Sequence, residues 1–338
     1  MKIRSAIFAG IMVIAAISIT SAIYDSGQSE QENKIRVAFF PNVGHIVPIV
    51  GLETGIFADG LGNQILIEPK IFDSGPQVIE AMFANSVDIA YVGPGPAING
   101  FLKSEKHDVK ILAGAASGGA SFVIHPDSTI NSAEDLSGKR IAAPQIGNTQ
   151  DISLRHYLSQ NRLIPAEKGG SVVVLNIQNP DIYTLFVKGE IDGAWVPEPW
   201  ATRLVQELGG KRLFFEEELW PDKQFASALL IGRTTYIEKN PEIIQSWIDS
   251  NNKTVTWINA NPKETELIFN QFMKKTLGKS LPENILSESL ANIKITSDPI
   301  EKSISIFAER ANSLGYLGRH GYDLEGIFYN AISKDDKS

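Results

Sequence analysis

The chain has 338 residues, a formal net charge of −8, 43% hydrophobic residues and no cysteine. This length exceeds the usual size of a single hydrophobic core, so two lobes are expected. The acidic balance argues against a nucleic-acid partner, which needs a basic face. The lack of cysteine excludes disulfides, thiolate metal sites, cysteine catalysis and a lipid-bearing N-terminal cysteine.

The first residues have the pattern of an export signal. Lys2 and Arg4 precede a stretch over 5–24 that carries no charge, which is typical of a secretory segment and is also long enough to span a bilayer. We therefore expect residues 1–25 to be a cleaved signal peptide or a retained membrane anchor. Either one places the remainder outside the cytoplasm. The polar residues 26–33 are predicted to be a tether.

Apolar strand patterns then alternate with helical patterns. The Gly-rich run 115–120 joins two strands and suits a crossing between lobes, and the apolar run 225–232 suits the return. Helical patterns flank most of the strands, beginning with 46–57 after the first. Strands are expected at 34–40, 64–72, 87–92, 109–114, 121–125, 141–143, 172–177 and 225–232.

Several loops between these elements have the composition of helix starts. Ser74 and Gly75 precede a proline that suits the first turn of a helix. The run Gly93-Pro94-Gly95-Pro96 ends a strand and leads to another helix, and Gly147-Asn148-Thr149 opens a third with possible capping residues. Helix N-termini expose unpaired amide groups and the positive end of the peptide dipole. These loops are therefore candidate anion sites.

One unit occurs twice in the chain. Residues 191–201 align with 87–97 without a gap, and the helical pattern of 182–187 repeats that of 78–83. Chance similarity between short strand–loop–helix segments is the alternative. If the repeat is real, two α/β lobes present equivalent loops, and a ligand lies between them.

The last third of the chain changes in composition. Proline stands near the start of four helical patterns, at 241, 262, 282 and 299, and these patterns continue to about Leu317. We expect a helical cover packed on the first lobe. An independent helical domain is the alternative, but no linker-like stretch separates these helices from the rest of the chain.

Four segments carry a family resemblance. Ser-Gly-Pro-Gln at 74–77, Val-Asp-Ile-Ala-Tyr-Val-Gly-Pro-Gly-Pro at 87–96, Asp-Leu-Ser-Gly-Lys-Arg at 135–140 and Ile-Asp-Gly-Ala-Trp-Val-Pro-Glu-Pro-Trp at 191–200 resemble the nitrate/sulfonate/taurine branch of ABC-transporter substrate-binding proteins. The resemblance implies an α/β periplasmic-binding-protein type II fold, with two lobes joined by a two-stranded hinge and a C-terminal helical cover. It further implies closure on a small anionic solute and its delivery to a permease powered by a cytoplasmic ATPase.

The resemblance also divides the chain. Residues 34–116 and 231–330 are expected to form lobe I, and 117–230 lobe II, in a monomeric protein without cofactor or metal. A pyrimidine-synthesising enzyme shares this fold, but its cysteine-rich patch is missing here. A transcription-regulator domain of related fold would carry an N-terminal helix-turn-helix, where this chain has the export segment.

The ligand is expected to contact loops at strand ends, where open α/β sheets bind small molecules. An oxyanion there would accept hydrogen bonds from backbone amides and polar side chains. Carried over by matching motif, the expected ligand-binding residues are Gly44, His45, Ser74, Gly75, Tyr91, Gly93, Pro94, Gly95, Asn148, Thr149, Trp195 and Glu198.

Some of these residues have a plainer alternative role. His45 can simply lie in a loop, and Tyr91 and Trp195 are residue types that often pack in cores. Glu198 would repel a bound anion, so it is expected to pair with the amine of an amino-sulfonate, bind a cation or point outward. An aliphatic sulfonate or taurine is the predicted solute, and nitrate, bicarbonate and pyrimidine thiamin precursors are the alternatives.

Overall fold

The computed structural model describes residues 34–62, 64–104, 108–318 and 321–330. The predicted export segment and tether lie outside these ranges. Within them, no helix combines the length and the apolar character that crossing a membrane requires.

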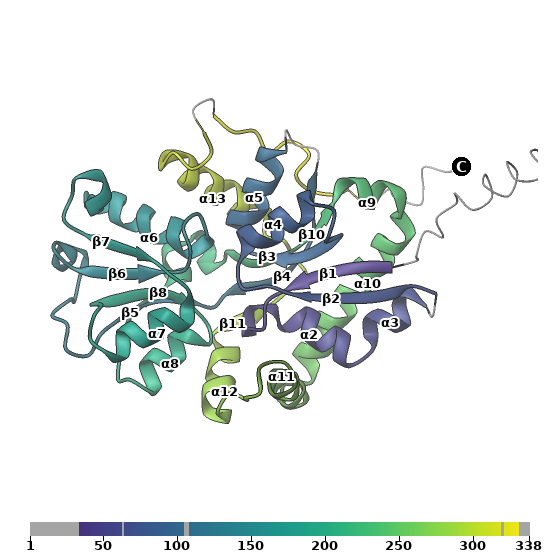
Figure 1. Ribbon diagram of the computed structural model, residues 1–338, viewed down its shortest axis with the longest axis horizontal. Helices are drawn as coiled ribbons and strands as arrows, with labels where there is room; N and C mark the ends of the chain where they lie inside the picture. Colours follow the sequence, from purple (N-terminus) through teal and green to yellow (C-terminus); the bar gives the residue numbers. More distant parts are fainter. Residues whose placement is uncertain (1–33, 63, 105–107, 319–320, 331–338) are drawn as a thin grey trace, which may run out of the picture.

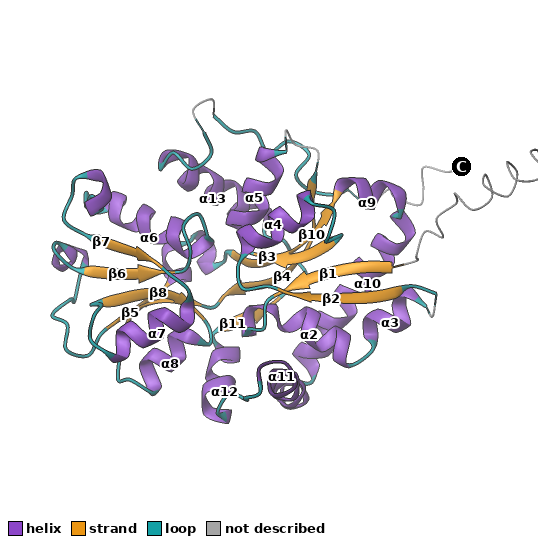
Figure 2. Ribbon diagram, in the orientation of Figure 1, coloured by secondary structure: helices purple, strands orange, loops and turns teal. Residues whose placement is uncertain are grey.

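Two sheets with helices on their faces form two lobes (Figures 1 and 2). The first sheet has the strand order β11-β4-β10-β3-β1-β2, and the second has the order β7-β6-β8-β5-β9. The strands are β1 (Lys34–Phe39), β2 (Leu66–Ile71), β3 (Ile89–Val92), β4 (Val109–Gly118), β5 (Ala120–Ile124), β6 (Arg140–Ala143), β7 (Val173–Asn176), β8 (Gly193–Pro197), β9 (Lys211–Phe215), β10 (Ala226–Arg233) and β11 (Ile293–Ile295).

The internal repeat is confirmed by the topology. In the first lobe β1 pairs in parallel with both β2 and β3, and in the second β6 pairs in parallel with both β7 and β8. Each unit then adds an antiparallel strand beside β3 or β8. The flanking helices correspond as well, because α4 (Gly75–Phe83) and α5 (Pro94–Lys103) stand around β3 as α7 (Asn179–Val187) and α8 (Trp200–Gln206) stand around β8.

An aspartate at the same place in each repeat fixes the start of the sheet unit. Asp88 accepts hydrogen bonds from the backbone N–H of Arg36 at 2.9 Å and from the side chains of Arg36 and Arg233 at 2.6–2.9 Å. Asp192 accepts the backbone N–H of Arg140 at 2.9 Å and pairs with Lys139 at 3.3 Å. Both aspartates therefore tie their own strand, β3 or β8, to the middle strand of the repeated parallel unit, β1 or β6.

The hinge lies where β4 leaves the first sheet. Gly118 and Gly119 both have positive φ, 75° and 76°, and turn the chain into β5. The chain returns as β10, which pairs with β4 from Ala226 onward. Residues 226–230 therefore belong to the first sheet, although the sequence placed them in lobe II.

The C-terminal helices cover the first lobe as expected and also reach the second. Trp247 of α10 (Pro241–Ala260) stacks on Phe57 of α3 (Ile56–Leu61) with ring centroids 4.1 Å apart, and α10 also packs on α2 (Ile46–Glu53). The remaining helices of the cover are α9 (Thr234–Lys239), α11 (Pro262–Leu277), α12 (Glu283–Ala291) and α13 (Glu301–Ser313). Of these, α12 packs against α8, and α13 packs against both α5 and α6 (Thr149–Gln160). The sequence did not predict these contacts between the cover and the second lobe.

Replacing either of the two repeat aspartates by asparagine is expected to lower the stability of the protein, but by different amounts. Asp88 is buried, so Asp88→Asn leaves two guanidinium groups without their counter-charge and is expected to cost about 3 kcal/mol. Asp192→Asn is the control, because the side chain of Asp192 is 27% exposed and its loss is expected to cost about 1 kcal/mol. Urea denaturation measures both, and equal losses would contradict the assignment.

The same pair predicts a pH dependence. Burial alone would raise the pKa of Asp88, but the bonds from Arg36 and Arg233 lower it below its ordinary value. The stabilisation is then complete above the unfolded-state pKa and is lost as the pH falls through the folded-state pKa. Denaturation curves of the Asp88→Asn variant are expected to approach those of the parent protein in acid.

Candidate ligand-binding cleft

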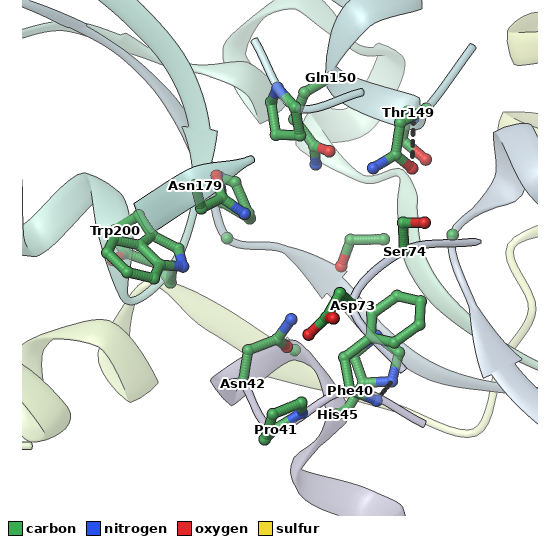
Figure 3. A pocket seen from close by; sticks show the side chains of 18 of the residues that line it. Phe40, Pro41, Asn42, His45, Asp73, Ser74, Thr149, Gln150, Asn179 and Trp200 are labelled. Atoms are coloured by element: carbon green, nitrogen blue, oxygen red, sulfur yellow. Dashed lines mark hydrogen bonds between the residues drawn. The ribbon is translucent and has the colours of Figure 1, made fainter. Parts of the chain in front are cut away.

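A cavity of about 290 Å³ lies between the two lobes. Its lining comes from loops that follow β1, β2, β3, β6, β7 and β8, together with the hinge glycines and the start of β10. Figure 3 shows side chains from both lobes pointing into this space. The loops at the carboxyl ends of the strands thus meet where the topology of open α/β sheets places ligands.

On the first-lobe side, the start of α4 faces the cavity. Ser74 is the N-cap of this helix, it is 2% exposed, and its hydroxyl has no hydrogen-bond partner in the protein. The first N–H groups of a helix also lack intrahelical acceptors. The Ser74 hydroxyl at this helix start therefore offers a donor to a ligand.

On the second-lobe side, the start of α6 occupies the corresponding place. The Oδ1 atom of Asn148 caps the helix by accepting the N–H of Thr149 at 3.0 Å. The buried hydroxyl of Thr149 has no partner. At the start of α7, Gln178 is the N-cap and Asn179 Oδ1 is buried without a partner.

The cleft also contains lining residues that the sequence analysis missed. Gln178 and Asn179 stand in the repeat at the places of Ser74 and Gly75, so the alignment itself was a signal for them. Asn42 and Asp73 follow strands in the same way. Ser227 of β10 also has a hydroxyl without a partner, and no motif pointed to it. Apolar lining comes from Phe40, Phe72, Trp200, Leu277 and Ile293.

His45 lines the cavity as a neutral, buried ring. Its Nδ1 accepts the N–H of Phe40 at 3.3 Å, and the two rings lie 4.2 Å apart between centroids. Burial lowers the pKa of His45 to about 3, so the imidazole carries no charge at neutral pH. Since the residues that line the cavity include no lysine or arginine, a bound anion here would be held by neutral donors.

Tyr91 and Trp195 do not line the cleft, and that prediction was wrong. Tyr91 is fully buried in the first lobe, where its hydroxyl donates to Asn251 at 2.9 Å and accepts from Trp247 at 3.2 Å. Trp195 is buried in the second lobe and donates to Glu216 at 2.7 Å. Because successive side chains of a strand point to opposite faces, a strand next to a cleft still sends large residues into the core.

Two of the glycines predicted to contact the ligand are closely packed against other residues. A Cβ atom at Gly75 would overlap Pro96, and one at Gly93 would overlap Thr149 Oγ1. Gly75, Pro94 and Gly95 are outside the cavity lining, whereas Gly93 and Gly44 are in it. Proline has no N–H, so the start of α5 offers fewer donors than the sequence suggested.

Glu198 borders the cavity, but its carboxylate is not available to a ligand. It accepts hydrogen bonds from Asn292 at 2.8 Å, from the backbone N–H of Thr202 at 3.0 Å, and from Arg212 and Ser289 at 3.3 Å each. Burial raises the pKa of Glu198. The hypothesis that Glu198 selects an amine is therefore replaced by a structural role in joining β8 to β9 and the C-terminal cover.

The lobes are in contact around the cavity. Ile152 of α6 belongs to a buried apolar cluster made mostly of first-lobe and cover residues. Tyr316, which follows α13, donates its hydroxyl to Asp151 at 2.9 Å. Together with the approach of Gly93 to Thr149, these contacts describe a closed arrangement.

Because protein groups already bond the carboxylate of Glu198, removing its charge is not expected to change the preference between solutes with and without an amine. Glu198→Gln is expected to change the affinity for an amine-bearing and an amine-free solute by the same factor, because its carboxylate contacts only protein groups. Isothermal titration calorimetry with taurine and ethanesulfonate measures both. A loss confined to taurine would restore the original hypothesis.

Comparison with known proteins agrees with this geometry. The taurine-binding periplasmic protein of Escherichia coli is 30% identical over 187 residues, which cover 54% of this chain and 55% of that protein. The chain thus spans about half the length of that relative. A putative aliphatic sulfonates-binding protein of Bacillus subtilis is 23% identical over 281 residues, covering 82% of this chain and 80% of the relative.

A solved structure and a family model support the fold and the family resemblance. The alkanesulfonate-binding protein SsuA from Xanthomonas axonopodis, bound to MOPS, matches with a TM-score of 0.71 at 17% identity, over 85% of this chain and 95% of that chain. The predicted fold and the predicted resemblance are therefore confirmed. A model of the NMT1-like family matches residues 28–270, and the chain belongs to this family.

Proposed function

We propose that this protein is the extracytoplasmic solute-binding component of an ABC importer. It captures a small oxyanion, an aliphatic sulfonate or taurine, between its lobes and delivers it to the permease. The observation that carries the proposal is the set of buried hydroxyls that have no partner and line one closed cavity, Ser74, Thr149 and Ser227. The relatives named for sulfonate and taurine binding support the same class of solute.

Neutral donors suit an oxyanion that must be bound and released. A hydrogen bond to a charged group contributes about 1.5–3 kcal/mol, and the starts of α4 and α6 add the positive ends of two helix dipoles. Among the residues that the structure describes, no lysine or arginine lines the cavity, so the anion has no ion pair to break there on release. The ligand favours the closed state through its contacts with both lobes.

The apolar part of the cavity favours a sulfonate over the smaller alternatives. Phe40, Trp200 and Leu277 line the cavity beside the polar groups. Nitrate and bicarbonate would use the donors but leave these apolar surfaces without a partner. A pyrimidine thiamin precursor would use the aromatic rings but lacks the compact anionic group.

Binding rather than catalysis is the role that these side chains support. His45 is the histidine in the cavity lining, and its ring is buried, neutral and bonded to the backbone. The described part of the chain shows no cluster of three histidine or acidic side chains placed to hold a metal. We therefore propose a carrier without enzymatic activity, which acts with a permease and its ATPase at the outer face of the membrane.

A thermal-shift and calorimetric screen tests the function. Purified residues 27–338 are expected to be stabilised by taurine or short alkanesulfonates, and more weakly or not at all by nitrate, bicarbonate or pyrimidines. Stabilisation by a pyrimidine alone would overturn the sulfonate proposal. Turnover of any bound compound would overturn the carrier assignment.

Two residues on α6 allow a matched test, because each variant removes one buried hydroxyl and only one of these hydroxyls has a partner in the protein. Thr149→Val removes a buried hydroxyl without a protein partner, so affinity for the solute is expected to fall about 10-fold while stability is kept. Ser153→Ala is the control, because its hydroxyl donates to the buried Glu216 at 2.5 Å. That variant is expected to lose about 1–2 kcal/mol of stability and no intrinsic affinity. Unchanged affinity in Thr149→Val would contradict the site.

A further inference from the structure

The two ends of the cleft differ in hydrogen-bonding character. Ser74 is extended, with φ −156° and ψ 154°, so its side chain and that of Asp73 point in opposite directions. Figure 3 shows the Ser74 hydroxyl on the side of Thr149, and the Asp73 carboxylate on the side of Asn42. One end therefore presents donors, and the other presents a carboxylate.

Asp73 is an exposed residue that also lines the cavity, and its carboxylate has no counter-charge among the residues that the structure describes. In the described part of the chain, no lysine, arginine or histidine forms an ion pair with it, and no side chain or backbone group is hydrogen-bonded to its carboxylate. The other carboxylate at the cavity, that of Glu198, is already neutralised by Arg212. A lone carboxylate near an anion site weakens anion binding, unless the ligand itself carries a positive charge.

A second acceptor points to the same requirement. Asn179 Oδ1 is buried at the cavity and accepts no hydrogen bond from the protein. Leaving a buried acceptor unpaired is costly, so a ligand that donates is favoured at this place. A primary ammonium group carries three N–H donors and a positive charge, so it suits the carboxylate of Asp73 and, as a donor, the kind of acceptor that Asn179 presents.

We infer that the cleft selects a zwitterion, a short amino-sulfonate, rather than a simple alkanesulfonate. This inference rests on the proposed function and adds the residue that decides between its two solutes. The sulfonate lies at the starts of α4 and α6, and the ammonium group lies at Asp73. Selectivity for the amine thus belongs to Asp73 and not to Glu198.

A structural role for Asp73 gives a different expectation. An acidic residue just before a helix stabilises the helix through its dipole, and Asp73 stands immediately before the N-cap of α4. If this were its function, Asp73→Asn would lower stability and leave the choice between solutes unchanged. The two roles are therefore separable by measuring selectivity and stability in the same variant.

Calorimetry with taurine and ethanesulfonate tests the inference, because the two differ only in the amine. The parent protein is expected to bind taurine at least 10-fold more tightly, and Asp73→Asn is expected to remove that difference by weakening taurine alone. Asp59→Asn is the control, since it neutralises an exposed carboxylate on α3 outside the cavity lining. It is expected to leave both affinities unchanged.

The outcomes separate this inference from the function on which it rests. Equal affinities in the parent protein, or equal losses in Asp73→Asn, would overturn the zwitterion while leaving a sulfonate carrier intact. Binding of neither compound to the parent protein would overturn the sulfonate function itself. Raising the pH until the amine of taurine is neutral supplies a further check, because only taurine binding is then expected to weaken.

Discussion

Buried polar groups without partners are the constraint on which this structure depends. The closed cleft contains the hydroxyls of Ser74, Thr149 and Ser227, none of which has a partner in the protein. Each such group costs about 1–3 kcal/mol when it is removed from water unpaired. Closure therefore becomes favourable when a ligand supplies the missing acceptors, and the empty protein gains by opening to water. Binding and closure are in this way one equilibrium rather than two successive events.

The repeated sheet unit explains why these groups meet. Asp88 and Asp192 each accept a hydrogen bond from a backbone N–H in the middle strand of the repeated parallel unit, that of Arg36 in β1 or that of Arg140 in β6. Both aspartates precede their strands, whereas the helix starts at the cleft follow strands. The aspartates thus fix the strands at one end of each sheet, and the hydrogen-bonding groups without partners lie at the other end. Two copies of one unit, facing each other, make a site that neither copy makes alone.

The positions of most strands, the repeat and the cleft loops were accessible from the sequence, because parallel α/β units leave strong periodic and glycine–proline patterns. Burial was not. Tyr91 and Trp195 stand at equivalent places in the repeat, yet both face their own core. Tyr91 faces α10 of the cover, whereas Trp195 faces α6 of its own lobe, so the direction of each depends on which helix covers which face of its sheet. Ser227 was missed for a related reason, since β10 returns from the second lobe and its neighbours are distant in sequence.

Glu198 and Asp73 show why partners, rather than residue type, decide the role of a carboxylate in a cleft. Glu198 is joined to Asn292 and Arg212, so it fastens the second lobe to the cover close to the hinge. Farther along the cover, Tyr316 bonds Asp151, whose other contacts include the N–H of Gly147 at 2.9 Å. The cover therefore contacts the second lobe both near the hinge and beside the α6 start that lines the cavity. Because the Tyr316 contact joins the cover to the second lobe, it adds to the stability of the arrangement in which the lobes are in contact.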